Sequence, residues 1–217
     1  MTTAIPMHDA ALLTLMQWLS PAYPVGAFAW SHGLERTIGR GDVRDAGGLA
    51  AWLSDVLSQG AGRSDAILLC VAYSADDVGP VADLAAALAP SVERRMETLQ
   101  QGAAFAATTR AIWQIHLPDM AYPVAVGRAA RLMDLPVQPV AQLWLQAFAS
   151  NLVQAAQRLM PLGQTDAQRI LASLAPICIR IGDDATRASL DDIGSATFAV
   201  DTASMQHKHQ YSRIFRS

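Results

Sequence analysis

The hydrophobic positions along the chain recur with the spacing of α-helices. In residues 137–159 the apolar side chains lie three or four positions apart, and glutamine, serine and arginine occupy the opposite face. A repeat of about 3.6 residues is typical of an amphipathic helix. We therefore predict one long helix over 137–159. Its apolar stripe consists of Val137, Val140, Ala141, Trp144, Phe148, Leu152, Ala155 and Leu159.

The same spacing predicts helices elsewhere in the chain. A first helix is expected to end at Ser20-Pro21, because the residue before a proline disfavours helical geometry. A second long helix is expected within residues 91–115, with Ser91 as its N-cap. The apolar positions behind these two predictions are Leu12, Leu15, Met16 and Leu19 in the first helix, and Val92, Met96, Leu99, Ala103 and Ala106 in the second.

Polar residues before apolar runs predict two further helix starts. Ser64 precedes the run that contains Ile67, and we predict it as an N-cap. Thr165 and Gln168 have the spacing of a capping box. Residues 177–181 alternate as a strand would, but a lone strand would leave its backbone unpaired, so we predict helix there. The sequence thus predicts an all-α, compact, bundle-like fold of about 8–10 helices, in one domain that spans residues 1–217.

The composition limits the partners of this helical body. Hydrophobic residues make up 52% of the chain and charged residues only 16%, against about 25% charged in an average domain. Some apolar surface is therefore expected to contact another protein, although a large alanine-rich core is the alternative explanation. The net charge is −3 and the basic residues are scattered, which argues against nucleic acid as a partner.

Nothing in the sequence predicts secretion or a membrane span. The N-terminus lacks the basic and apolar regions of a signal peptide. The longest wholly apolar run, residues 66–73, is far shorter than the roughly 20 residues of a spanning helix. Cys70 and Cys178 lack the CxxC spacing of metal or redox sites and are predicted to be reduced core residues. We expect a cytoplasmic protein.

The common catalytic and cofactor motifs are missing. The sequence contains no GxSxG, HExxH, GxxxxGK[ST] or GxGxxG pattern, so we predict a protein that is not an enzyme and has no metal or cofactor of its own. His207 and His209 are two positions apart and would point in opposite directions on a helix or a strand, which argues against a shared metal site. The catalytic alternative is a small metal-dependent hydrolase that uses Ser31, His32 and Glu35.

The two ends of the chain have the most unusual sequences. Residues 20–35 are dense in proline, glycine and aromatic residues, which favours a fixed irregular loop. Pro24, Phe28 and Trp30 in this loop either pack into the core or serve a function. Residues 201–217 are predicted to be a helical tail that carries Tyr211, Ile214 and Phe215 on one face. Three large apolar residues at a terminus favour docking on a partner over packing on the body.

Both ends resemble the urease accessory protein family UreF. The early family motif is Ser-Pro-x-x-Pro-Val-Gly, continuing to Gly-Leu-Glu, and the late motif begins Ile-Gly-Ser-Ala-Thr and ends Gln-Tyr-Ser-Arg-Leu-Phe-Arg-Ser. The early motif is matched by Ser20, Pro21, Pro24, Val25, Gly26, Phe28, Ser31, Gly33, Leu34 and Glu35. The late motif is matched by residues 193–197 and by Ser204, His207, Gln210, Tyr211, Ser212, Arg213, Phe215, Arg216 and Ser217. The sequence departs from the family pattern at Ala29, Phe198, Gln206 and Lys208.

The resemblance implies an all-α protein that forms a homodimer and takes part in urease maturation. Its implied partners are UreD (also called UreH), the GTPase UreG and apo-urease, with nickel as the cargo of the complex. The tail 201–217 would dock on UreD through His207, Tyr211, Arg213, Ile214, Phe215 and Arg216. The implied charges for UreG binding or gating are Glu35, Asp65 and Arg158. A further hypothesis is that Arg213 or Arg216 stimulates GTP hydrolysis by UreG.

Overall fold

A computed structural model describes residues 9–216, which form ten α-helices and two short 3-10 helices and contain no strand. The helices are α1 (Asp9–Trp18), α2 (Leu34–Gly39), α3 (Ala46–Gln59), α4 (Ala61–Ser74), α5 (Gly79–Ala87), α6 (Val92–Trp113), α7 (Tyr122–Leu132), α8 (Val137–Leu159), α9 (Gln164–Ala185) and α10 (Phe198–His207), with η1 (Ala27–Ala29) and η2 (Leu190–Asp192) between them. The predicted all-α fold class is confirmed, and so is the helix predicted for residues 177–181, which lie within α9.

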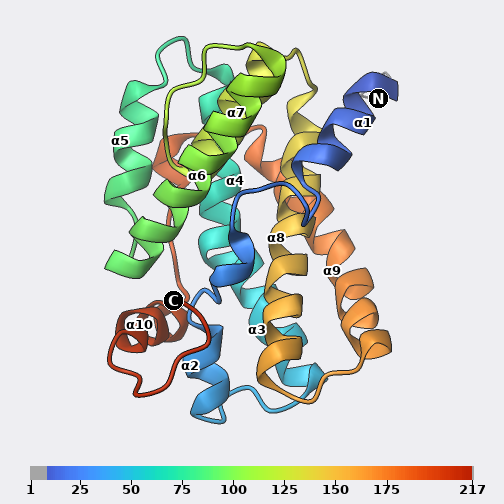
Figure 1. Cartoon of the computed structure of the whole chain (residues 1–217), viewed down its shortest axis with the longest axis vertical. Coiled ribbons are helices and arrows are strands. Elements are labelled where there is room, and N and C mark those ends of the chain that lie inside the picture. Colours follow the sequence, from blue (N-terminus) through green and yellow to red (C-terminus); the bar gives the residue numbers. More distant parts are fainter. Residues whose placement is uncertain (1–8, 217) are drawn as a thin grey trace.

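Helix α4 lies at the centre of the molecule. It packs against α3, α5, α7, α8 and α9, while α8 and α9 run side by side along one flank (Figure 1). Because neighbours surround α4, its apolar residues need not be confined to one face. The residues of α4 that are fully or almost fully buried are Ala66, Ile67, Leu68, Leu69, Cys70 and Ala72. The long apolar run in the sequence is therefore a core helix.

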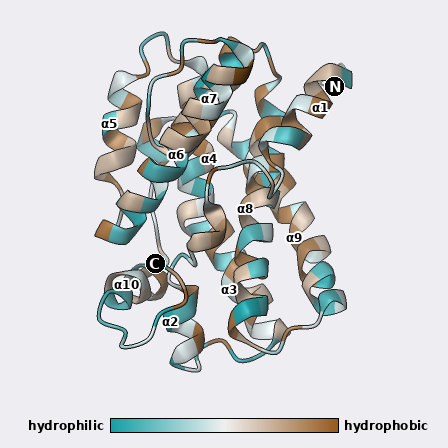
Figure 2. Ribbon diagram, in the orientation of Figure 1, coloured by the Kyte–Doolittle hydropathy of each residue, from teal (hydrophilic) through white to brown (hydrophobic). Residues whose placement is uncertain are grey.

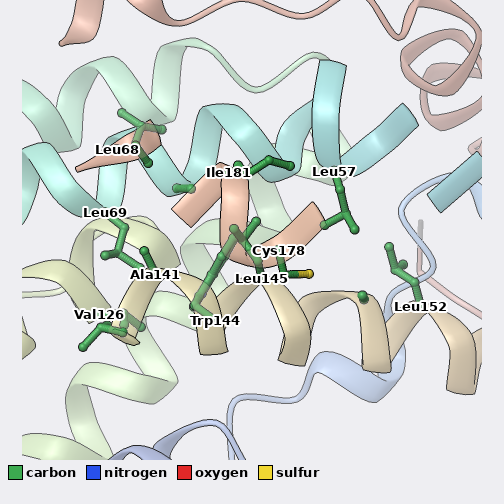
Figure 3. Close-up of a cluster of buried hydrophobic side chains, with 14 of the residues drawn as sticks. Leu57, Leu68, Leu69, Val126, Ala141, Trp144, Leu145, Leu152, Cys178 and Ile181 are labelled. Carbon is green, nitrogen blue, oxygen red and sulfur yellow. The ribbon is translucent and has the colours of Figure 1, made fainter. Parts of the chain in front are cut away.

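One apolar core joins buried residues from every α-helix that the structure describes. Figure 3 shows Leu57 from α3, Leu69 from α4, Val126 from α7, Leu145 from α8 and Ile181 from α9 converging in one cluster. Hydrophobic and hydrophilic residues alternate along α8 and α9 (Figure 2), as expected for amphipathic helices with one buried face. Cys70 and Cys178 are both buried and free, as predicted.

The helix starts separate the correct local predictions from the wrong ones. Helix α8 has the predicted bounds, and the Ser91 hydroxyl accepts a hydrogen bond from Arg94 N at 3.0 Å at the start of α6. The Ser64 and Thr165 cap predictions were wrong, because α4 begins after Gly60 and α9 after Gly163. The Ser64 hydroxyl donates instead to the carbonyl of Gly194 at 3.3 Å. Ser64 therefore makes a tertiary contact and does not cap a helix.

The predicted apolar face of α6 was also wrong in its first half. Val92 and Met96 are exposed, whereas Arg94, Glu97 and Gln101 are buried. These buried polar residues have partners inside the protein, and this makes their burial tolerable.

Candidate partner-docking site

The loop before α2 adopts backbone conformations that its glycines make possible. Gly26 and Gly33 have φ values of 74° and 79°, a left-handed region that glycine enters without steric cost. At Gly33 a side chain is also excluded by contact, because a Cβ there would lie 2.9 Å from Ser204 N in α10. The loop and α10 thus touch backbone to backbone.

The turn from Ser31 to Glu35 is almost completely buried. The Ser31 hydroxyl accepts a hydrogen bond from Glu35 N at 3.3 Å, which supports the start of α2. His32 has a φ of 57°, and its ring packs edge-on against Phe148, with 5.2 Å between ring centroids. Burial, together with the positive charge of Arg94, lowers the pKa of His32 well below its usual value. His32 is therefore a neutral core residue at physiological pH.

Glu35 joins the N-terminal loop to the C-terminal end of the chain. Its carboxylate is hydrogen-bonded to His207 Nε2 at 2.8 Å and accepts hydrogen bonds from Ile214 N at 2.7 Å and Phe215 N at 3.1 Å. Glu35 is only 4% exposed, so its carboxylate is enclosed within the protein and is not a surface charge. No sequence pattern signals this contact, because Glu35 and its partners are more than 170 positions apart.

Arg158 covers the same junction from the surface. Its guanidinium lies 4.3 Å from the centre of the Phe215 ring and donates a hydrogen bond to the carbonyl of Phe28 at 2.8 Å. Next along the chain, Arg216 N donates to the carbonyl of Ala29 at 2.9 Å, and the Arg216 guanidinium lies 5.9 Å from the centre of the Trp30 ring. Arg158 and Arg216 therefore hold the loop and the C-terminus together.

The C-terminal end differs from the predicted helical tail. Helix α10 ends at His207, and residues 208–216, named here the C-terminal segment, are irregular and lie against the body beside α2 and α10 (Figure 1). Phe215 is buried, whereas Tyr211 and Ile214 are exposed. The prediction of one apolar helical face was wrong, because the backbone donates to Glu35 rather than to a further helical turn.

The aromatic residues of the N-terminal loop divide in the same way. Trp30 is buried, whereas Phe28 is 79% exposed and Pro24 is also exposed. The packing alternative therefore holds for Trp30 and fails for Pro24 and Phe28. An aromatic side chain that is mostly in solvent at a rigid position is a typical contact point for another protein.

A buried cluster of charges lies next to the loop. Arg94 of α6 forms an ion pair with Glu97 and lies 3.9 Å from Asp65 of α4. Desolvation raises the pKa of Asp65 to about 6, in spite of the opposing effect of Arg94. Sequence reasoning named Asp65 and missed Arg94 and Glu97. Their i, i+3 spacing, with Gln101 four positions further on, was the available signal, because it places all three residues on one helical face.

The geometry does not support the hydrolase alternative. Ser31 and His32 are buried, and the Glu35 carboxylate is occupied by His207 and by the C-terminal segment. Within residues 9–216, no group of three or more histidine, cysteine, aspartate or glutamate residues is arranged to hold a metal ion. None of the helices that the structure describes has the length and apolar character needed to cross a membrane. The fold and site thus define an all-α protein in which the loop of residues 20–35 meets the C-terminal segment at a junction built around the buried carboxylate of Glu35.

Comparison with known proteins identifies the family. The UreF family model matches residues 43–175, which leaves both end motifs outside the match. The chain is 49% identical over 218 residues to a urease accessory protein UreF from Roseobacter denitrificans, a match that covers 100% of this chain and 98% of the relative. It is 54% identical over 209 residues to UreF from Cereibacter sphaeroides strain KD131, with 96% and 100% covered. The chain belongs to the UreF family, whose members are non-catalytic urease accessory proteins.

Proposed function

We propose that this protein is a cytoplasmic scaffold that binds UreD, recruits the GTPase UreG and brings both to apo-urease for nickel delivery. The observation that carries this proposal is the identity of about half of all residues to UreF proteins along the whole chain. Nickel is then the cargo of the complex, and the scaffold acts as a homodimer.

The junction between the loop of residues 20–35 and the C-terminal segment is the proposed docking surface for UreD. Its solvent-facing apolar side chains are Phe28, Tyr211 and Ile214, which are 79%, 107% and 57% exposed. Arg213 and Arg216 of the C-terminal segment are exposed and add positive charge there. A surface with exposed aromatic groups and arginines has the composition of an interface core with its polar rim.

The three charges assigned to UreG divide by their burial. Arg158 is exposed and available to a partner, whereas Glu35 is buried and the side chain of Asp65 is only 18% exposed. We therefore propose that Arg158 contacts UreG, and that Glu35 and Asp65 act through the structure that they support.

Removal of the C-terminal segment tests the docking proposal. A chain that ends at Gln210 keeps α10 intact and lacks Tyr211 and all later residues. We expect helical content by circular dichroism to be retained and co-purification with UreD to be lost. Ile179→Ala, at an exposed apolar position of α9, is the matched control and should still capture UreD. Undiminished capture by the shortened chain would refute the proposal.

A further inference from the structure

A polar groove of about 560 Å³ lies where the end of α3 and the start of α4 meet the last turns of α9 and η2. Its charged lining consists of Arg63, Arg180, Asp184, Arg187 and Asp192. None of the residues that line it belongs to the loop of residues 20–35 or to the C-terminal segment. The docking surfaces proposed above therefore leave this groove unassigned.

Both carboxylates of the groove already have donors close to them in the chain. Asp184 forms an ion pair with Arg187 at 2.8 Å. The carboxylate of Asp192 accepts hydrogen bonds from the backbone N–H and the hydroxyl of Ser189, at 2.8 and 3.0 Å. These donors offset part of the negative charge in the groove, and the three arginines outnumber the two aspartates. The remaining excess of charge in the groove is positive.

Two of the arginines keep N–H donors for a ligand. Arg63 donates from Nη1 to the carbonyl of Asp192 at 2.6 Å, which holds its side chain at the groove and leaves its other N–H groups available. Arg180 is exposed and forms no hydrogen bond or ion pair with any residue that the structure describes. A guanidinium stays charged at physiological pH, and its planar fork matches the oxygens of carboxylate and phosphate groups. The groove thus offers two separate forks to an anion.

We propose that this groove binds a small molecule with two or more oxyanion groups, held by Arg63 of α4 and Arg180 of α9. Two arginines on different helices favour a ligand with two charged groups, because each guanidinium pairs with one oxyanion group. The volume of the groove is within the range of small-molecule sites. Among the described residues no aromatic side chain lines it, so a nucleobase has no ring to stack on. Polyphosphates and polycarboxylates share the required chemistry.

The charge of the whole chain makes such binding a local property. The net charge is −3, so the protein as a whole repels anions. An anion that binds in spite of this charge must be held by the arginines of one site. Binding and the position of the arginines can therefore be tested together.

Amide NMR spectra of the isolated full-length protein test the site. The protein is titrated with pyrophosphate and, separately, with citrate, at constant physiological ionic strength so that screening does not change. We expect saturable shifts of the signals of residues 58–63 and 180–192, with a dissociation constant below about 1 mM. Saturation by pyrophosphate alone would support a phosphate ligand, and saturation by citrate alone a polycarboxylate. No saturable shift in these residues with either anion would overturn the proposal. Neither UreD nor UreG is present, so the result is independent of the proposed function.

Arg180→Ala sharpens the test, because Arg180 is exposed and has no partner whose loss would disturb the fold. We expect the affinity for the anion to fall about tenfold or more, with an unchanged thermal melt by circular dichroism. Arg95→Ala, at an exposed arginine of α6 outside the groove, removes the same charge and is the matched control. It should leave the affinity unchanged. Equal weakening by both variants would mean that the anion responds to net charge and not to the groove, and would overturn the proposal. Undiminished binding by Arg180→Ala would overturn it as well.

Discussion

The helical body and the junction between the loop of residues 20–35 and the C-terminal segment are held together by different kinds of contact. Helices α3, α4, α7, α8 and α9 share one apolar core in which many side chains are fully buried. The junction depends on a few directional contacts around Glu35, Arg158 and Arg216. Apolar burial spreads stability over many residues, whereas hydrogen bonds to a single carboxylate concentrate it in one. Substitutions in the body should therefore change folding, and substitutions at the junction should change partner binding first.

The largest expected effect is in the body, where α7 crosses α4 at Gly127. A Cβ added there would lie 2.1 Å from the carbonyl oxygen of Leu69, a backbone atom that cannot move alone. We expect Gly127→Ala to lower the free energy of unfolding by about 2–3 kcal/mol, measured by urea denaturation, although alanine is the better helix former. Gly39→Ala in α2, where nothing lies within 4 Å of the added carbon, is the control and should be neutral or slightly stabilising. Equal stability of the two variants would contradict the close backbone contact between α7 and α4.

A smaller effect is expected from the charge cluster between the body and the loop. Burial raises the pKa of Asp65 to about 6, so the folded protein holds this proton more tightly than the unfolded chain. The contribution of Asp65 to stability is therefore fully present below about pH 4 and is lost as the pH rises through about 6. Asparagine does not titrate. We expect the stability of Asp65→Asn, relative to the natural chain, to increase by about 2 kcal/mol from pH 4 to pH 7.

The control for this pH dependence is Asp166→Asn. Asp166 is exposed and forms a surface ion pair with Arg169, so its substitution should change stability little at any pH. A difference between Asp65→Asn and the natural chain that stays constant with pH would show that Asp65 has an ordinary pKa in the folded protein.

The smallest effect on stability is expected at the junction itself. Arg158→Ala removes the contact with the Phe215 ring and the hydrogen bond to the Phe28 carbonyl. We expect a loss of about 1 kcal/mol in the free energy of unfolding, together with a clear loss of UreG capture in a pull-down. Arg169→Ala, an exposed arginine of α9, should alter neither. A destabilisation as large as that of Gly127→Ala would mean that the junction and the body are one cooperative unit.

The sequence by itself determined the helices that are marked by signals within their own residues, such as an apolar period or a capping serine. The apolar period of residues 137–159 predicted the bounds of α8, because a helix that buries one face must repeat its apolar residues every three or four positions. Ser91 was predicted as a cap and is one, since its hydroxyl needs only a backbone N–H three residues away. The two end motifs indicated the family on their own, because each is a long run of specific residues and the two occur in the family's order.

Only the tertiary structure decided where the polar groups near the two ends lie. Arg94 and Glu97 form an ion pair, and Arg94 also lies beside Asp65, so these contacts offset the loss of hydration on burial. Glu35 is buried because residues 207–215 supply hydrogen-bond donors to its carboxylate. The same dependence turned the predicted helical tail into an irregular segment with Phe215 inward and Tyr211 outward. Periodicity reports which face of an element is apolar. It does not report which distant residue will supply the partner that makes a charge tolerable inside the protein.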